Sequence, residues 1–121
     1  MKLLIALLPF VFISGVWAQD NQQRDAEAIA QLIKVTKYLA DSDLRCAKAS
    51  DCKIIPIGSR ACGGPSSYMI TSQFNSNMAE LEYLATQTEV KQAAYNRNYN
   101  VMSICTLVMP PEAKCVASYC R

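Results

Sequence analysis

The chain has 121 residues, of which 12 are basic and 10 acidic, and it contains no histidine. A net charge of +2 gives no electrostatic reason to bind nucleic acid or an anionic membrane surface. The absence of histidine excludes serine–histidine–aspartate and cysteine–histidine catalysis, and it removes the commonest metal ligand. We therefore expect a protein that is not an enzyme and that holds no metal or other cofactor.

Residues 1–18 have the pattern of a signal peptide. Lys2 precedes an uncharged apolar run over residues 3–16, and Trp17 and Ala18 precede the polar residue Gln19. The run is shorter than the roughly 20 residues that a membrane-spanning helix needs. We predict cleavage after Ala18, export to the periplasm or the extracellular space, and no membrane span in the mature chain. Residues 19–121 then form one domain.

Residues 20–44 have the periodicity of an amphipathic helix. Asp20 or Asn21 can cap its start, and Asp41 and Asp43 mark its end. Its apolar positions recur at steps of three and four and predict one buried stripe: Ala26, Ile29, Leu32, Ile33, Thr36, Leu39, Ala40 and Leu44.

A strand is predicted for residues 52–57, where Pro56 favours a sheet edge because it cannot donate to a ladder. The loop over residues 58–67 contains three glycines, three serines and one proline, so we expect it on the surface. Residues 71–96 return to helical periodicity. Two capping-box spacings, Asn77 with Glu80 and Thr86 with Glu89, predict a helix start and a break near Thr86.

Residues 101–109 are apolar on both faces, which predicts the buried central strand of a sheet, and residues 113–119 predict a short last strand. The fold class is therefore α+β, with two to three helices packed on a small antiparallel sheet of about three strands. The methionines lie on predicted apolar faces, and we expect them to fill gaps in the core: Met69, Met78, Met102 and Met109.

An even number of cysteines in an exported chain predicts three disulfides. No Cys-x2-Cys pair is present, so a zinc site is not indicated. The spacings are nearly palindromic, and pairing from the outside inwards gives a nearly constant sum of residue numbers, 166 or 167. We favour this nested scheme among the 15 pairings that six cysteines allow: Cys46 with Cys120, Cys52 with Cys115, and Cys62 with Cys105.

Paired carboxylates remain possible in principle, and seven of the ten acidic residues are the candidates. They lie on polar faces or at the ends of elements, so we expect solvated side chains rather than a carboxylate pair across a cleft: Asp41, Asp43, Asp51, Glu80, Glu82, Glu89 and Glu112. Exposed tyrosines are favoured in protein interfaces, but buried ones are equally compatible with the pattern.

The loop is the candidate binding element. Arg60 and Ala61 precede a cysteine and a stiff turn, and this arrangement resembles substrate-like inhibitors of serine proteases, in which a basic side chain enters the primary pocket of the enzyme. Rigidity lowers the entropy lost on docking. We hypothesise a module that inhibits an extracellular or periplasmic hydrolase through Arg60, Ala61, Gly63, Gly64, Pro65 and Tyr68. The alternative is a structural or envelope-associated protein that binds a protein partner through a sheet edge or a helix.

Overall fold

The computed structural model describes residues 16–121, with the side chains of residues 20–121. The predicted signal peptide therefore lies outside the described residues, apart from its last three positions. No helix in this part of the chain has the length and apolar character needed to cross a membrane. The elements are α1 (Val16–Asp41), a short 3-10 helix (Ala49–Asp51), β1 (Cys52–Ile57), β2 (Ser67–Ser72), α2 (Met78–Asn98), β3 (Cys115–Val116) and β4 (Tyr119–Cys120).

Helix α1 forms where the apolar stripe predicts it and ends at Asp41. Its buried positions include Ile29, Thr36 and Ala40. The Thr36 hydroxyl donates to the Leu32 carbonyl at 2.7 Å, which satisfies a polar group inside the helix packing. Residues 16–19 are already helical, so neither Asp20 nor Asn21 caps the start of this helix as predicted.

Strands β1 and β2 form an antiparallel hairpin, with Cys52 opposite Ser72 and Ile57 opposite Ser67. The prediction of β1 is confirmed in its full length. The predicted helix from residue 71 is wrong at its start, because Thr71 and Ser72 belong to β2. Both belong to a short segment that also contains Tyr68 and isoleucine, residue types that favour strands over helices.

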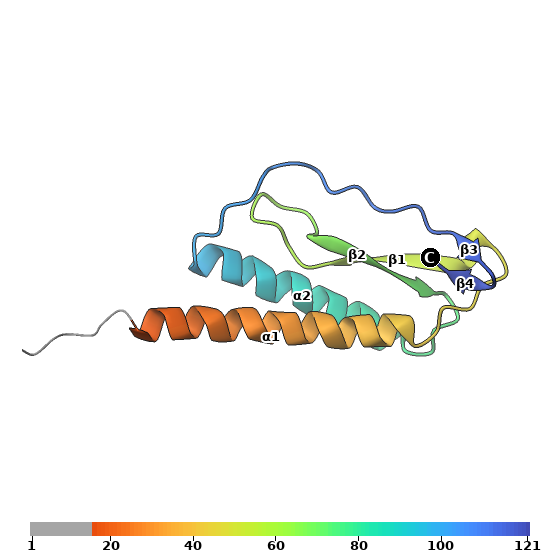
Figure 1. The fold of residues 1–121 in the computed structure, drawn as a ribbon, viewed down its shortest axis with the longest axis horizontal. Coiled ribbons are helices and arrows are strands. Elements are labelled where there is room, and N and C mark those ends of the chain that lie inside the picture. The colour runs from red at the N-terminus through yellow and green to blue at the C-terminus, as the bar shows by residue number, and fades with distance from the viewer. Residues whose placement is uncertain (1–15) are drawn as a thin grey trace, which may run out of the picture.

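The two helices cover one face of the β1–β2 hairpin (Figure 1). Helix α1 packs against α2 and β2, and α2 packs against β1. Each large apolar side chain buried in this layer contributes about 1.5–3 kcal/mol relative to exposure. The buried core is small, and a small core makes the disulfides important for stability. The buried core residues are Ala40, Ile55, Ile57, Met69, Leu81 and Ala85.

Helix α2 is continuous from Met78 to Asn98, so the predicted break near Thr86 is wrong. The Thr86 hydroxyl donates to the Glu82 carbonyl at 3.0 Å. The Thr86 hydroxyl is therefore satisfied by a carbonyl of the preceding helical turn, and Thr86 does not act as the N-cap of a new helix. Asn77 is the N-cap residue, although its side chain makes no capping hydrogen bond.

Residues 101–109 are not the buried central strand that their apolar pattern predicts. Residues 101–114, named here the strap, belong to no strand of the described structure, although Lys114 exchanges two backbone hydrogen bonds with Arg121. The strap runs along the side of the β1–β2 hairpin away from the helices (Figure 1). The two helices cover one face of the two-stranded sheet, and the strap lies on the other side. Within the described structure, no further layer covers the outer side of the strap.

Four large apolar side chains of the strap are exposed as a result. The exposed fractions are 93% for Met102, 78% for Ile104, 79% for Leu107 and 69% for Met109. The expectation of four core methionines is therefore wrong for two of them, whereas Met69 is buried.

The three disulfides join the C-terminal part of the chain to the region around β1. The predicted bridge Cys62–Cys105 is confirmed. The other two predicted bridges are wrong, because the partners are exchanged: Cys46 bonds Cys115, and Cys52 bonds Cys120. The predicted last strand is instead the β3–β4 hairpin, whose tight turn places these two C-terminal cysteines side by side.

Candidate functional site

The candidate site consists of the loop, residues 58–66, and the strap that it holds. Helix α2 anchors the base of the loop through polar side chains spaced four residues apart. The Thr88 hydroxyl accepts from the Gly58 N–H at 2.9 Å, and Gln92 Oε1 accepts from the Ser59 N–H at 2.7 Å. The Asn96 amide donates to the Ser59 carbonyl at 2.9 Å. The loop therefore leaves β1 in a defined direction.

Gly58 is required by this close approach. Its φ is +70°, and a Cβ at this position would lie 2.1 Å from Gln92 Oε1. A side chain here would displace Gln92 and adopt a left-handed backbone conformation that L-residues disfavour. This glycine thus serves the attachment of the loop to α2.

The tip of the loop is a closed turn. The Arg60 N–H donates to the Gly64 carbonyl at 2.9 Å, and the Gly63 N–H donates to the Arg60 carbonyl at 2.9 Å. Gly63 and Gly64 have φ of +97° and +79°, which glycine adopts readily. Ala61, Cys62 and both glycines are exposed, and Pro65 is half-buried.

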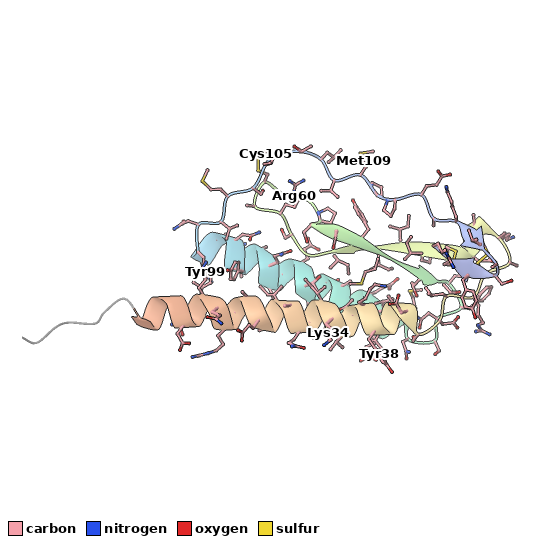
Figure 2. The ribbon with its side chains drawn as sticks, in the orientation of Figure 1. Lys34, Tyr38, Arg60, Tyr99, Cys105 and Met109 are labelled. Carbon is pink, nitrogen blue, oxygen red and sulfur yellow. A yellow bond between two sulfur atoms is a disulfide. The ribbon has the colours of Figure 1, made fainter. Side chains whose placement is uncertain are left out.

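The Arg60 guanidinium connects the loop to the strap. Half-buried, it donates to the carbonyls of Ile104 and Thr106, and it lies between the loop and the strap beside Cys105 (Figure 2). Hydrogen bonds from a charged donor are stronger than neutral ones. In this structure Arg60 therefore holds the strap in place, and its side chain does not project freely into solvent.

Two further contacts continue this junction. The Cys62 N–H donates to the Ser103 hydroxyl at 3.3 Å, and the Tyr68 hydroxyl donates to the Val108 carbonyl at 3.3 Å. The structure thus brings the predicted residues Arg60 and Tyr68 against one segment. It also adds the strap itself, which the sequence placed in the core.

The carbonyls of Ile104, Thr106 and Val108 all accept from the loop or the hairpin. Their spacing of two is that of an extended strand, in which alternate backbone groups point to opposite edges. The N–H and C=O groups of Cys105 and Leu107 therefore face the other edge. That edge has no backbone partner among the residues that the structure describes.

Two hollows flank the Arg60 side chain. One, of about 330 Å³, lies between the loop and the end of α2 and is also lined by Arg97. The other, of about 170 Å³, lies between the loop and Leu107 of the strap. No carboxylate lines either hollow, so these surfaces offer hydrogen bonds and apolar contacts without a general acid or base.

The sulfur atoms of Cys46, Cys52 and Cys120 lie within 4.8 Å of one another at the other end of the strap. Each belongs to a disulfide in this structure. Metal ligation requires a thiolate, so this cluster acts as a covalent anchor for the strap.

Sequence reasoning missed the residues of α2 that hold the loop. Thr88 and Gln92 lie on the stripe that faces the core, and a polar side chain on an otherwise apolar stripe signals a buried hydrogen bond. That signal was present in the sequence. No sequence signal indicated that the strap is exposed, because its apolar pattern is also that of a central strand.

Comparison with known proteins assigns no family to this chain. It matches no protein-family model, and comparisons with curated proteins and with solved structures find no match.

Proposed function

We propose that this chain is an exported, non-enzymatic binding module and that its strap binds a protein partner. The observation that carries the proposal is the exposure of Met102, Ile104, Leu107 and Met109 on one covalently tethered segment. Exposed apolar surface of this extent is uncommon in soluble proteins and marks interaction sites, and here four large apolar side chains are exposed within eight residues. Because disulfides hold the strap at Cys105 and directly after its last residue, little conformational entropy is lost when a partner binds.

The backbone of the strap supports a specific mode of binding. Its outer edge offers the N–H and C=O groups of Cys105 and Leu107, while Arg60 holds the inner edge. An extended segment of a partner can add to such an edge, with main-chain hydrogen bonds supplying affinity and side chains supplying selectivity. The proposed partner surface is therefore an exposed strand with aliphatic side chains.

Export is supported by two independent features. Three disulfides in a small domain are compatible with an oxidising compartment. The N-terminal sequence has the pattern of a signal peptide. Together they favour a secreted or periplasmic location, where covalent anchors also protect an exposed segment from proteolysis.

Inhibition of a hydrolase is a narrower form of the proposal. For Arg60 to enter the pocket of a protease, its guanidinium must release the carbonyls of Ile104 and Thr106. Titration of the oxidised chain against trypsin tests this form. Undiminished trypsin activity at micromolar protein would exclude it, whereas the proposal of a binding strap does not require inhibition. A structural role in the cell envelope is compatible with the same binding mode.

Affinity capture from the native periplasmic or extracellular fraction tests the proposed site. The baits are the wild-type chain, Ile104→Lys and Leu107→Lys. Val90→Lys is the matched control, because Val90 is an apolar side chain of α2, outside the strap, that is 56% exposed. We expect both strap variants to retain at least tenfold less of the captured protein, about 1.4 kcal/mol, while the control retains it. Equal retention by all four baits would contradict the proposal.

A further inference from the structure

We propose that the strap pairs in antiparallel orientation with the strap of a second copy of this chain, in a two-fold arrangement centred on Cys105. This inference rests on the proposed function, because it names a partner for the same surface. A two-fold interface must be self-complementary, since each contact occurs twice. The backbone, the side chains and the charges of the strap each meet that requirement.

The backbone determines which residues can lie opposite each other. In the part of the chain that the structure describes, the backbone groups of Cys105 and Leu107 face the outer edge, because the carbonyls of Ile104, Thr106 and Val108 face inwards. Ser103 is an exception among the odd-numbered residues, because its carbonyl oxygen lies 3.3 Å from Cys62 Sγ of the loop. The paired segment is limited to residues 101–109, since Asn100 has φ of +50° and Pro110 begins a double proline that lacks N–H donors. Pairing centred on Cys105 uses this whole segment and matches odd with odd residues.

The side chains fit in that register. Each of the four large exposed residues lies opposite a smaller residue of the second copy, which favours close cross-strand packing. The opposed pairs are Met102 with Val108, Ile104 with Thr106, Leu107 with Ser103, and Met109 with Val101.

The charges favour the antiparallel orientation. Residues 101–111 carry no ionisable side chain, so pairing them creates no repulsion between like charges. Arg97 precedes this segment and Glu112 follows it, with Lys114 two residues further on. Antiparallel pairing brings Glu112 of one copy to the end where Arg97 of the other copy lies. Parallel pairing would instead place Glu112 beside Glu112 and Arg97 beside Arg97.

The interface is small. Nine residues of one strand per copy fall short of the roughly 1,200–2,000 Å² that stable complexes bury. We therefore expect a dissociation constant in the micromolar range, and the test must extend to concentrations well above it.

Sedimentation velocity of the oxidised chain, from low micromolar to near-millimolar concentration, measures the monomer–dimer equilibrium. Leu107→Pro removes an N–H from the pairing edge, and Val108→Pro is its matched control, since that N–H faces the hairpin. We expect a concentration-dependent dimer that Leu107→Pro weakens at least tenfold and that Val108→Pro largely retains. A monomer at every concentration, or equal loss in both variants, would overturn the inference.

Amide hydrogen exchange of the wild-type chain tests the same register without a substitution. On raising the concentration, the N–H groups of Cys105 and Leu107 should exchange more slowly, while those of Ile104 and Thr106 remain unchanged. Uniform protection, or none, contradicts the register. If the chain stays monomeric while the strap variants lose a captured partner, this inference fails and the proposed function stands. If the chain stays monomeric and the strap variants capture the same proteins as the wild type, the inference and the proposed function both fail.

Discussion

Cys115 and Cys120 lie directly opposite each other in the β3–β4 hairpin, yet they bond different cysteines, Cys46 and Cys52. The β3–β4 hairpin is thus fastened at two adjacent points, to the segment between α1 and β1 through Cys46 and to the first residue of β1 through Cys52. Together with Cys62–Cys105, these bridges hold the strap at Cys105 and directly after its last residue. In the chain-entropy model, closing loops of this length stabilises a domain by about 4 kcal/mol for the first bridge.

Peptide mapping distinguishes this pairing from the nested one. Trypsin alone leaves Cys115 and Cys120 on one peptide, so chymotrypsin must also cut after Tyr119. Under non-reducing conditions, we expect the peptide of residues 46–48 to be joined to residues 115–119, and the peptide of residues 49–53 to residues 120–121. Residues 46–48 joined to residues 120–121 would support the nested pairing instead.

The turn of the β3–β4 hairpin contains two residues with positive φ, Ala117 at +51° and Ser118 at +67°. This geometry is that of a type I′ turn, which favours Asn-Gly, and a non-glycine residue there costs on the order of 1–2 kcal/mol. The double variant Ala117→Asn, Ser118→Gly should therefore raise the free energy of unfolding by about 1–2 kcal/mol in urea denaturation.

The same dipeptide occurs once more, at Ala49 and Ser50, where φ is not positive. The matched variant Ala49→Asn, Ser50→Gly should leave stability unchanged or lower it. If both double variants stabilise the chain equally, the backbone of the β3–β4 turn is not the cause.

Asp51 is only 4% exposed, which corrects the expectation of a solvated carboxylate. Its carboxylate accepts from the N–H of Ala47 at 2.8 Å and of Lys48 at 3.2 Å, and from the Gln73 amide at 2.8 Å. The bond from Ala47 is the main reason that the pKa of Asp51 is lowered, while burial acts in the opposite direction.

A lowered pKa in the folded state sets the direction of the pH effect. The pKa of an aspartate in the unfolded chain is about 3.9. The stabilisation by the ionised Asp51 is complete at pH values above this pKa, and it is lost as the pH falls through the lower pKa of the folded state. Asp51→Asn should therefore lower stability at neutral pH and flatten its fall below about pH 4. Denaturation curves at several pH values measure this, with Glu82→Gln, on the exposed face of α2, as the control for net charge. An unchanged slope for Asp51→Asn would contradict the assignment.

Arg60→Ala removes both guanidinium bonds to the strap. Because the side chain is half-buried, we expect a loss of about 1 kcal/mol, which lowers the melting temperature by roughly 4–8 °C in a domain of this size. Arg60→Lys should restore only part of it, since an ammonium group lacks the planar fork. Arg97→Ala, an exposed arginine beside the same hollow, is the control. An unchanged melting temperature for Arg60→Ala would show that this contact contributes nothing to stability.

The helices and β1 could be predicted from the sequence because each satisfies a local rule. The stripe through Ile29 and Ala40 faces the core, and the isoleucines of β1 favour a strand. The strap could not be predicted in the same way. Its side chains have the pattern of a central strand, but burial depends on whether a second layer exists, and that is a property of the whole fold.

The disulfides were likewise predictable only in part. The sum of residue numbers is that of an antiparallel chain reversal, and Cys62–Cys105 follows it. Cys115 and Cys120 are neighbours across a tight turn, so spacing along the chain does not distinguish their partners. For the site, Arg60 and Tyr68 belong to the junction with the strap, but the atoms that they bind are backbone carbonyls, which carry no signal in the sequence.

The outward-pointing strap can be tested as a binding surface by photo-crosslinking. A diazirine-bearing amino acid is placed at Leu107 in one chain and at the exposed α2 residue Val90 in another, and each is illuminated in the native extracellular or periplasmic fraction and at high concentration of the pure chain. We predict a discrete crosslinked protein, a second copy or a distinct partner, from position 107 and none from position 90. Crosslinking from position 90 alone, or from neither position, would contradict the account of the strap as the binding surface.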